Sequence, residues 1–239
     1  MRILEGRKVT KHFGGLAAVH QVDFDIDQGE VVGLIGPNGA GKTTLFNLIS
    51  GSLPTTAGEI RYKGKKITGL KPHQISKMGV ARTFQSAKLF AGLTVFENAL
   101  AASLFGTKRA ISVSDAEREA TELLKFVELP TVGAMPAKDL PIANRKRLEV
   151  ARALATKPDL LMVDEVMAGL NPAEIAQAME LITKIRDMGI TIFMIEHVMK
   201  AIMNACDRII VLHHGSKIAE GTPEEIATSR TVVEVYLGE

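Results

Sequence analysis

The sequence predicts an α/β protein with a mostly parallel sheet, an N-terminal antiparallel β subdomain and an inserted helical subdomain. Short, almost wholly apolar runs such as "EVVGLIG", "DLLMVDE" and "ITIFMIE" alternate with stretches of helical periodicity. Runs of this kind are typical of parallel strands that are covered on both faces. Two further stretches, "GEIRYKGKKI" and "DRIIVLHHGSKIAEG", place turn signals between short strands and predict β-hairpins.

The first half of the chain contains strands, a helix and then a longer helical region. Alternating apolar and polar residues in "VHQVDFDID", residues 19–27, predict a half-exposed strand, which a buried strand follows. A helix is expected from about residue 42 to residue 50, where Gly51 ends it. From about Leu93 to Leu140, two segments carry helical periodicity with no strand signal between them, which predicts an inserted helical lobe.

The second half returns to alternating strands and helices. An amphipathic helix, "AEIAQAMELITKIRDMG", separates two of the buried strands. We therefore predict a single domain over residues 1–239, with its core in residues 1–87 and 141–239. The helical subdomain is expected over about residues 88–140.

Composition restricts the possible functions. The net charge of +2 comes from 29 basic and 27 acidic residues, a balance that gives no strong field for binding a polyanion along its length. The single cysteine, Cys206, excludes an internal disulfide, and its apolar neighbours predict a packing role. The N-terminus lacks the apolar segment of a secretory signal, and no stretch approaches the roughly 20 apolar residues of a membrane helix. We therefore expect a cytoplasmic protein that reaches a membrane only through a partner.

A glycine-rich motif predicts a nucleoside triphosphate site. The segment "GPNGAGKT", residues 36–43, matches G-x-x-x-x-G-K-[ST] at every fixed position and lies between a predicted strand and a helix. Glycines let successive N–H groups surround phosphate oxygens, and the helix N-terminus adds its positive dipole end. Lys42 can reach the β- and γ-phosphates, and the Thr43 hydroxyl can bind Mg²⁺. The complete motif disfavours the alternative, a glycine-rich turn without a ligand.

Further polar residues follow the ends of buried strands. Asp164 ends "LLMVD" and can hold Mg²⁺ through water, while Glu165 beside it can polarise an attacking water. His197 follows "TIFMIE" at the edge where phosphates bind and could hydrogen-bond the γ-phosphate. Gln85 lies where the core meets the helical lobe, and its amide could contact Mg²⁺ or water. The alternatives are solvated acids at a strand end, a structural histidine and an ordinary polar glutamine.

Together these features resemble the ATP-binding subunit of an ABC transporter, over essentially the whole chain. The similarity to the branched-chain amino-acid importer class is carried by "KHFGGLAAVHQVDFDIDQGEVVGLIGPNGAGKTTLFNLISG", "ARTFQSAKLFAGLTVFENAL", "RLEVARALATKPDLL" and "VYLGE". The resemblance implies a P-loop NTPase core that hydrolyses ATP with Mg²⁺. It further implies that hydrolysis powers import of branched-chain or related amino acids.

The resemblance assigns roles to matching positions. Phe13 matches the aromatic residue that stacks on adenine, and Val19 lines the same face. Gln85, Asp164 and Glu165 match the Q-loop glutamine, the Walker B aspartate and the catalytic base, and His197 matches the switch histidine. The implied Mg²⁺ ligands are Thr43, Gln85 and Asp164. The remaining nucleotide contacts are expected from the phosphate loop: Gly36, Pro37, Asn38, Gly39, Ala40, Gly41, Lys42, Thr43 and Thr44.

The family likeness also implies partners. Two such subunits, identical or different, close head to tail over two ATP molecules, each between one chain's phosphate loop and the other chain's signature sequence. Residues 168–171, "AGLN", match the D-loop that packs across this dimer. A permease subunit is expected to dock its coupling helix over about residues 85–103, and a substrate-binding protein acts indirectly. The resemblance implies a peripheral position on the inner face of the cell membrane and no nucleic acid.

The signature sequence departs most from the family. The usual L-S-G-G-Q corresponds here to five other residues: Leu140, Pro141, Ile142, Ala143 and Asn144. The serine hydroxyl and both glycines are absent, although a helix N-terminus from Asn144 onward is expected to remain. We expect this segment to bind a partner's ATP weakly and to support slower hydrolysis there. Val166 and Val198 also replace a common proline and a common aspartate.

Two alternative functions remain to be compared. A soluble ABC ATPase acting on nucleic acid or ribosomes could use the basic helix start at Arg145, Lys146 and Arg147. That class usually carries long coiled-coil insertions, zinc hooks or two fused ATPase domains, which this sequence lacks. A P-loop kinase or GTPase is disfavoured because neither a guanine-reading motif nor an arginine-bearing lid is visible.

Overall fold

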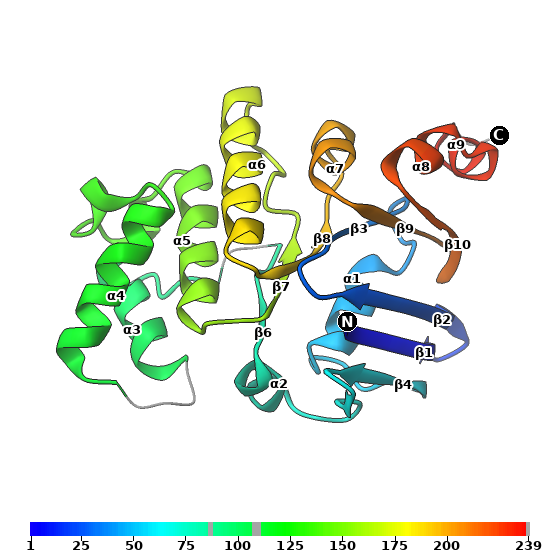
Figure 1. Cartoon of the computed structure of the whole chain (residues 1–239), viewed down its shortest axis with the longest axis horizontal. Helices are drawn as coiled ribbons and strands as arrows, with labels where there is room; N and C mark the ends of the chain where they lie inside the picture. The colour runs from blue at the N-terminus through cyan, green and yellow to red at the C-terminus, as the bar shows by residue number, and fades with distance from the viewer. Residues whose placement is uncertain (86–87, 107–110, 238–239) are drawn as a thin grey trace.

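The structure is a computed structural model, which describes residues 1–85, 88–106 and 111–237. Its strands form two sheets, and helices pack around the second of them (Figure 1). This arrangement confirms the predicted α/β fold with an antiparallel N-terminal sheet and a mostly parallel second sheet.

The N-terminal sheet has the strand order β2-β1-β4-β5, and neighbouring strands are antiparallel. Its strands are β1 (Arg2–Phe13), β2 (Leu16–Asp27), β4 (Ala57–Tyr62) and β5 (Lys65–Lys66). Val22, Phe24 and Ile26 of β2 are buried, and the residues between them are more exposed. This alternation is the half-exposed strand that the sequence predicts.

The second sheet has the order β10-β9-β3-β8-β7-β6, in which only β10 is antiparallel to its neighbour. Its strands are β3 (Val31–Ile35), β6 (Val80–Arg82), β7 (Leu160–Asp164), β8 (Thr191–Ile195), β9 (Arg208–His213) and β10 (Ser216–Gly221). Strands β3, β8 and β7 are buried along their whole length, in agreement with their apolar sequences. Because these three strands are parallel neighbours, the residues that follow them meet at one edge of the sheet.

The helices fall into two groups. Those that accompany the sheets are α1 (Lys42–Ile49), α2 (Pro72–Met78), α6 (Pro172–Asp187), α7 (Met199–Ala205), α8 (Pro223–Thr228) and α9 (Arg230–Leu237). The other group comprises α3 (Val95–Phe105), α4 (Val113–Phe126), α5 (Ile142–Ala155) and the 3₁₀ turns η1 (Pro130–Val132) and η2 (Ala137–Asp139). Helix α5, which the prediction assigned to the core, packs against α3 and α4 (Figure 1). The subdomain limits therefore stay a prediction, and the one at residue 87 lies outside the described residues.

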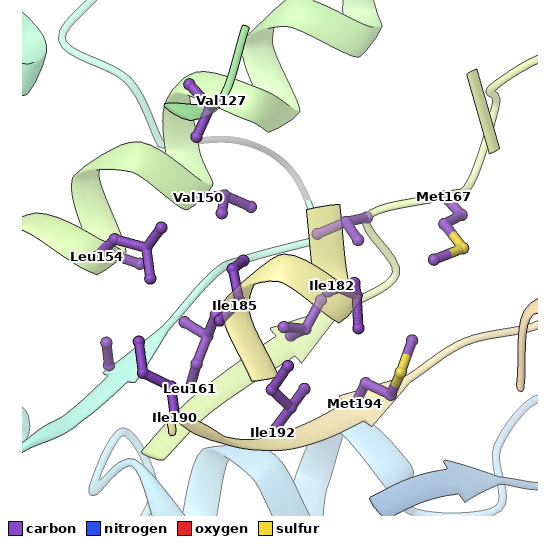
Figure 2. Packing of buried hydrophobic residues seen from close by; sticks show 14 of the residues in the cluster. Val127, Val150, Leu154, Leu161, Met167, Ile182, Ile185, Ile190, Ile192 and Met194 are labelled. Atoms are coloured by element: carbon purple, nitrogen blue, oxygen red, sulfur yellow. The ribbon is translucent and has the colours of Figure 1, made fainter. Parts of the chain in front are cut away.

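One apolar cluster fixes the helical group to the sheet (Figure 2). Val150 and Leu154 of α5 belong to the same cluster as Ile182 and Ile185 of α6, beneath which β7 and β8 lie. Each large aliphatic side chain buried in this way contributes about 1.5–3 kcal/mol. Cys206 is part of the cluster, which confirms its predicted packing role.

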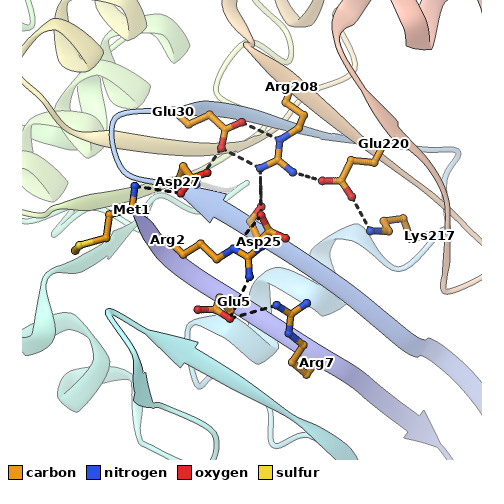
Figure 3. Close-up of polar contacts among 10 residues, drawn as sticks. All are labelled: Met1, Arg2, Glu5, Arg7, Asp25, Asp27, Glu30, Arg208, Lys217 and Glu220. Atoms are coloured by element: carbon orange, nitrogen blue, oxygen red, sulfur yellow. Dashed lines mark hydrogen bonds and ion pairs between the residues drawn. The ribbon is translucent and has the colours of Figure 1, made fainter.

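Charged side chains join the two sheets at their surface (Figure 3). Arg208 of β9 donates to Glu30 at 2.8 Å and to the carbonyl oxygen of Asp25 in β2, also at 2.8 Å. It pairs with Glu220 of β10 as well. The Arg208 side chain is 22% exposed, so the network is partly screened by solvent.

Helix α5 begins earlier than the sequence suggested. The predicted start was Asn144 or beyond, whereas the helix starts at Ile142 with Pro141 at its N-cap. Proline has no N–H group to leave unpaired, and its fixed φ suits a helix start. Of the signature positions, Ile142, Ala143 and Asn144 thus form the first turn of α5, whose backbone N–H groups have no partner within the helix, while Leu140 and Pro141 precede it.

Candidate functional site

The phosphate loop joins β3 to α1, and its shape depends on its glycines. Gly36, Gly39 and Gly41 have φ angles of 147°, 81° and 102°, a region that favours glycine. A Cβ atom on Gly36 would lie 2.1 Å from the Leu212 carbonyl oxygen, and one on Gly41 would lie 2.3 Å from that of Ala18. The loop is therefore held closely between β9 and β2. Its N–H groups and the N-terminus of α1 form a setting suited to phosphate.

An open cavity of about 230 Å³ lies at this loop. It is lined by Ala18, Asn38, Gly39, Ala40, Gly41, Lys42, Thr43, Thr44, Gln85, Glu165 and His197. The structure thus brings Gln85, Glu165 and His197 to the phosphate loop from three distant parts of the sequence. Of the predicted site residues in other segments, Asp164, which is buried directly behind Glu165, does not line this cavity, and neither do Phe13, Val19 and the signature residues.

Lys42 lies at the base of the loop and is 6% exposed. Its ammonium donates to the carbonyl oxygens of Gly36 at 2.6 Å and Pro37 at 3.0 Å. Burial lowers the pKa of Lys42, while the carboxylates of Glu165 and Asp164 oppose that shift. An ammonium has three donors, and two are used here, so one remains for a phosphate oxygen.

Glu165 is the centre of a polar cluster in the cavity. Its Oε1 lies 2.7 Å from Nε2 of His197, and its Oε2 accepts a hydrogen bond from Nε2 of Gln85 at 2.7 Å. Its backbone is left-handed, with φ of 51°. A hydrogen bond from its N–H to the Ile195 carbonyl oxygen, 2.9 Å long, holds the residue beside the end of β8. The carboxylate is therefore fixed at both oxygens, the arrangement needed to orient a base.

The buried carboxylate of Asp164 has a partner that sequence reasoning missed. Asp164 is 1% exposed, and its Oδ2 accepts a hydrogen bond from Nη2 of Arg82 at 2.8 Å. Burial raises the pKa of Asp164, and the Arg82 guanidinium opposes this shift. Arg82 lies three residues before Gln85, and its basic side chain in the short strand "VAR" was the available signal.

The oxygens expected to hold Mg²⁺ fit a hard divalent cation. Oδ1 of Asp164 is buried and lacks a hydrogen-bond partner among the described residues. The Thr43 side chain is exposed at the cavity. Gln85 uses its amide nitrogen on Glu165, which leaves its carbonyl oxygen as the possible ligand atom. Carboxylate, hydroxyl and amide oxygens are the donors that Mg²⁺ prefers.

Glu196 is a second residue that the sequence analysis missed. It is 1% exposed and accepts hydrogen bonds from the N–H groups of Met167 at 2.8 Å and His197 at 3.3 Å. Burial raises the pKa of its carboxyl to about 7, against the effect of the two backbone donors. The signal was a single acid at the end of the apolar run "ITIFMIE". Glu196 joins the segment after Glu165 to the one that carries His197.

The two residues expected at the adenine differ in exposure. Phe13 is 47% exposed at the end of β1, and the Lys11 ammonium lies 5.1 Å from the centroid of its ring. Val19 is fully buried in the core, so it contributes packing here and presents no surface to a base. The stacking role of Phe13 stays a prediction.

The signature positions lie at the surface at the start of α5. Leu140 is buried, whereas Ile142 is 59% exposed and Pro141 is also exposed. The N-cap makes no side-chain hydrogen bond to the first turn, because proline has no acceptor there. The backbone donors of this turn are the groups that could face a phosphate from another subunit.

The basic residues of α5 contact acceptors within the chain. Arg145 donates to carbonyl oxygens of the segment before the helix. Lys146 donates to the carbonyl oxygens of Glu165 and Ala168, and Arg147 pairs with Glu128. These contacts hold the basic groups close to the fold, which disfavours a nucleic-acid-binding role for them.

The predicted D-loop, residues 168–171, follows this cluster. Ala168 and Gly169 are exposed. Asn171 caps α6 by accepting hydrogen bonds from the N–H groups of Ala173 and Glu174. The exposed residues Ala168 and Gly169 are therefore positioned by the capped N-terminus of α6 that follows them.

A larger cavity of about 350 Å³ lies between β6 and helices α3 and α5. Its lining includes three aromatic residues, Phe84, Phe90 and Phe105. Phe90 and Phe105 are 51% and 81% exposed, so an apolar surface faces outward here. The predicted permease-docking segment, residues 85–103, borders this groove, although residues 86–87 lie outside the described part of the chain.

Comparisons with known proteins agree with these features. Residues 19–168 match the family model described as ABC transporter, and residues 216–239 match the one described as branched-chain amino acid ATP-binding cassette transporter. The chain is 42% identical over 250 residues to the high-affinity branched-chain amino acid transport ATP-binding protein BraF of Pseudomonas aeruginosa, covering 99% of this chain and 98% of that protein.

Solved structures are similar over the whole fold. A nucleotide-free ATP-binding cassette from an ABC transporter has a TM-score of 0.90 and 30% identity, with 100% of both chains covered. A dimeric cassette in a post-hydrolysis state bound to ADP and Pi has a TM-score of 0.85 and 27% identity, covering 92% of this chain and 99% of that one. No helix in the described residues is both long and apolar enough to cross a membrane.

Proposed function

The chain belongs to the ABC transporter ATP-binding family, and from this premise we propose that it is the ATP-hydrolysing subunit of an importer for branched-chain or related amino acids. The observation that carries the proposal is the cluster of Gln85, Glu165 and His197 in the cavity at the phosphate loop. The C-terminal family match and the identity to BraF support the solute class.

The cluster suggests how hydrolysis proceeds. Lys42 and the loop N–H groups bind the phosphates, and the Glu165 carboxylate accepts a proton from the attacking water. His197, hydrogen-bonded to Glu165, orients that carboxylate and can contact the γ-phosphate. Thr43, Gln85 and Asp164 would hold Mg²⁺, which neutralises charge on the phosphates when bound. Phe13 is proposed to stack on adenine.

The subunit acts in this proposal as half of a dimer. The first turn of α5 at Ile142, Ala143 and Asn144 faces the partner's ATP with backbone N–H groups, without the serine hydroxyl and the glycines of the usual signature. In a heterodimer whose other chain has an ordinary signature, the site at Lys42 hydrolyses ATP and the site against Ala143 is weaker. Single-site nucleotide trapping in the assembled pair tests this, and equal turnover at both sites would contradict it.

The groove lined by Phe84, Phe90 and Phe105 is proposed to receive a permease subunit, which holds the chain at the inner face of the membrane. Exposed aromatic residues with a few charged neighbours suit an amphipathic helix. Such docking explains how a chain whose described helices do not span a membrane can drive transport across one.

The decisive experiment reconstitutes the chain in vesicles with its permease subunits and substrate-binding protein. We expect ATP-dependent uptake of radiolabelled leucine or a related amino acid into vesicles, and loss of uptake with Glu165→Gln. ATPase activity that depends on added RNA, without membrane association, would instead support a soluble ABC ATPase. Vesicles that hydrolyse ATP and take up a different solute would revise the solute class alone.

A further inference from the structure

Arg82 links the phosphate-loop helix, the buried aspartate and the outer groove. We propose that Arg82 is a positioning residue that couples the groove at Phe84 to the orientation of Asp164. The coupling part of this proposal rests on the transporter function proposed above.

The hydrogen bonds of Arg82 reach two separate elements. Nη1 donates to Oδ1 of Asn47 at 2.7 Å and to Oγ of Ser50 at 3.0 Å, at the end of α1. Nη2 donates to Oδ2 of Asp164, the last residue of β7, at 2.8 Å. The side chain is 7% exposed, so these charge-assisted contacts are shielded from water. A single planar group therefore fixes the orientation of the Asp164 carboxylate and turns its Oδ1 away from Arg82.

Two aromatic rings flank the guanidinium. Its carbon lies 5.6 Å from the ring centroid of Phe46 in α1 and 5.2 Å from that of Phe84. Both distances are within the range of cation–π attraction. Phe46 is fully buried, whereas Phe84 is only partly buried. The ring on the groove side is therefore the one that a docked partner can contact.

Phe84 and Arg82 both line the groove of about 350 Å³. The Phe84 N–H donates to Oε1 of the buried Glu149 in α5 at 2.9 Å, and its neighbour Gln85 contacts Glu165. A helix pressing on Phe84 thus has two routes to the hydrolytic cluster. One route runs through Gln85 to Glu165, and the other runs through Arg82 to Asp164.

Arg82→Lys tests the proposal because lysine keeps the positive charge and loses the planar fork. Arg208→Lys is the matched control, since Arg208 also has several acidic partners and lies in the network that joins the sheets (Figure 3). Both substitutions disturb a partly or fully buried ion-pair network. Only the first one is expected to affect the metal site.

The first measurement uses the whole chain alone and a fluorescent ATP analogue. The quantity measured is the Mg²⁺ concentration at which binding of the analogue is enhanced half-maximally. Residues that hydrogen-bond a metal ligand typically change metal affinity by about 10- to 100-fold when they are replaced. Arg82→Lys should therefore raise this Mg²⁺ concentration by roughly tenfold or more. In EDTA, the affinity of Arg82→Lys for the analogue should stay within about twofold of the wild-type affinity. Arg208→Lys should match the wild type both in its Mg²⁺ dependence and in its affinity in EDTA. An unchanged Mg²⁺ dependence in Arg82→Lys would overturn the positioning role.

The second measurement uses the assembled transporter with solute-loaded binding protein. Arg82→Lys should reduce the stimulation of ATPase activity by about fivefold or more, while the complex still forms on size exclusion. Phe84→Leu, which leaves the hydrogen bonds of Arg82 in place, should reduce stimulation without changing the Mg²⁺ dependence of the chain alone. If Arg82→Lys folds poorly, the stimulation measured for Phe84→Leu still tests the coupling.

The outcomes separate the two proposals. Normal stimulation in both variants overturns the coupling, even if the wild type transports as expected. A wild-type complex that solute does not stimulate contradicts the transporter function and the coupling with it. The Mg²⁺ titration still decides in that case whether Arg82 positions Asp164.

Discussion

Replacing Glu196 by glutamine should stabilise the protein at alkaline pH and have little effect in acid. The carboxylate is buried between the N–H groups of Met167 and His197, and the positive charge of Lys146 favours its ionised form. Burial raises the pKa of this group from 4.5 to about 7, a shift that the two donors and Lys146 only partly oppose. Glutamine has nearly the shape of the acid and the neutral charge of its protonated form. Its amide oxygen can accept the 2.8 Å bond from Met167, while its amide nitrogen gives up the longer, 3.3 Å bond from His197.

The size of the effect follows from the pKa shift. A raised pKa means that the folded state binds the proton more tightly than the unfolded state. The resulting stabilisation is complete below about pH 4.5 and is lost as the pH rises through about 7. At about 1.4 kcal/mol per pKa unit, the wild type is expected to lose about 3 kcal/mol by pH 8, and the variant is expected to keep it.

Urea unfolding at pH 5 and pH 8 measures this difference. The free energy of unfolding of Glu196→Gln should exceed that of the wild type by up to about 3 kcal/mol at pH 8 and by less than about 1 kcal/mol at pH 5. Glu180→Gln, at an exposed position of α6, controls for the loss of one negative charge. If Glu196→Gln changes stability equally at both pH values, the carboxyl does not change its protonation between them, and the reasoning from burial fails.

Three further substitutions test the site. Glu165→Gln should lower phosphate release by about 10²–10⁴-fold because the general base is lost, with binding of a fluorescent ATP analogue retained; near-normal turnover would place the base elsewhere. Gly215→Ala should weaken binding of that analogue by about tenfold, since Gly215 donates to the Ala40 carbonyl oxygen at 3.0 Å and an added Cβ would lie 2.9 Å from the Ala17 carbonyl oxygen. The control Gly29→Ala has a similar φ and open space around it, so it should cost only about 1–2 kcal/mol of stability, and equal binding in the two variants would refute the fit of the loop. Pro141→Ser should supply α5 with an N-cap oxygen that stabilises the helix by about 1 kcal/mol. In a Glu165→Gln background it should strengthen ATP-dependent dimerisation by about tenfold. Sedimentation velocity measures the dimer, and an unchanged dimer population would contradict this prediction.

Local sequence signals predicted much of the fold and site. The phosphate loop is recognisable because its glycines and Lys42 all act within one short loop, where Lys42 donates to the Gly36 carbonyl oxygen. Their spacing along the chain is therefore fixed. The strand ends at Asp164 and His197 could be aligned because apolar runs indicate buried parallel strands. The sequence therefore predicted which polar groups meet at the edge of the sheet.

Contacts between distant segments were out of reach. Arg82 lies 35 residues from Asn47 and 82 residues from Asp164, so no local pattern connects them. Glu196 was missed because an acid at the end of a strand is usually solvated, and only the packing of the segment after Glu165 buries it. The start of α5 was misplaced because Pro141 was not considered as an N-cap.

The position of β3 within its sheet has a consequence for synthesis on the ribosome. β3 ends at Ile35, yet its two neighbours are β8 and β9, which begin at Thr191 and Arg208. A nascent chain that carries the complete phosphate loop therefore has no strand beside β3 until most of the polypeptide has emerged. We expect that nucleotide does not stabilise the growing chain, because the folded binding site has not yet formed. The apolar strand β3 is therefore exposed to chaperones and to aggregation until translation is nearly finished.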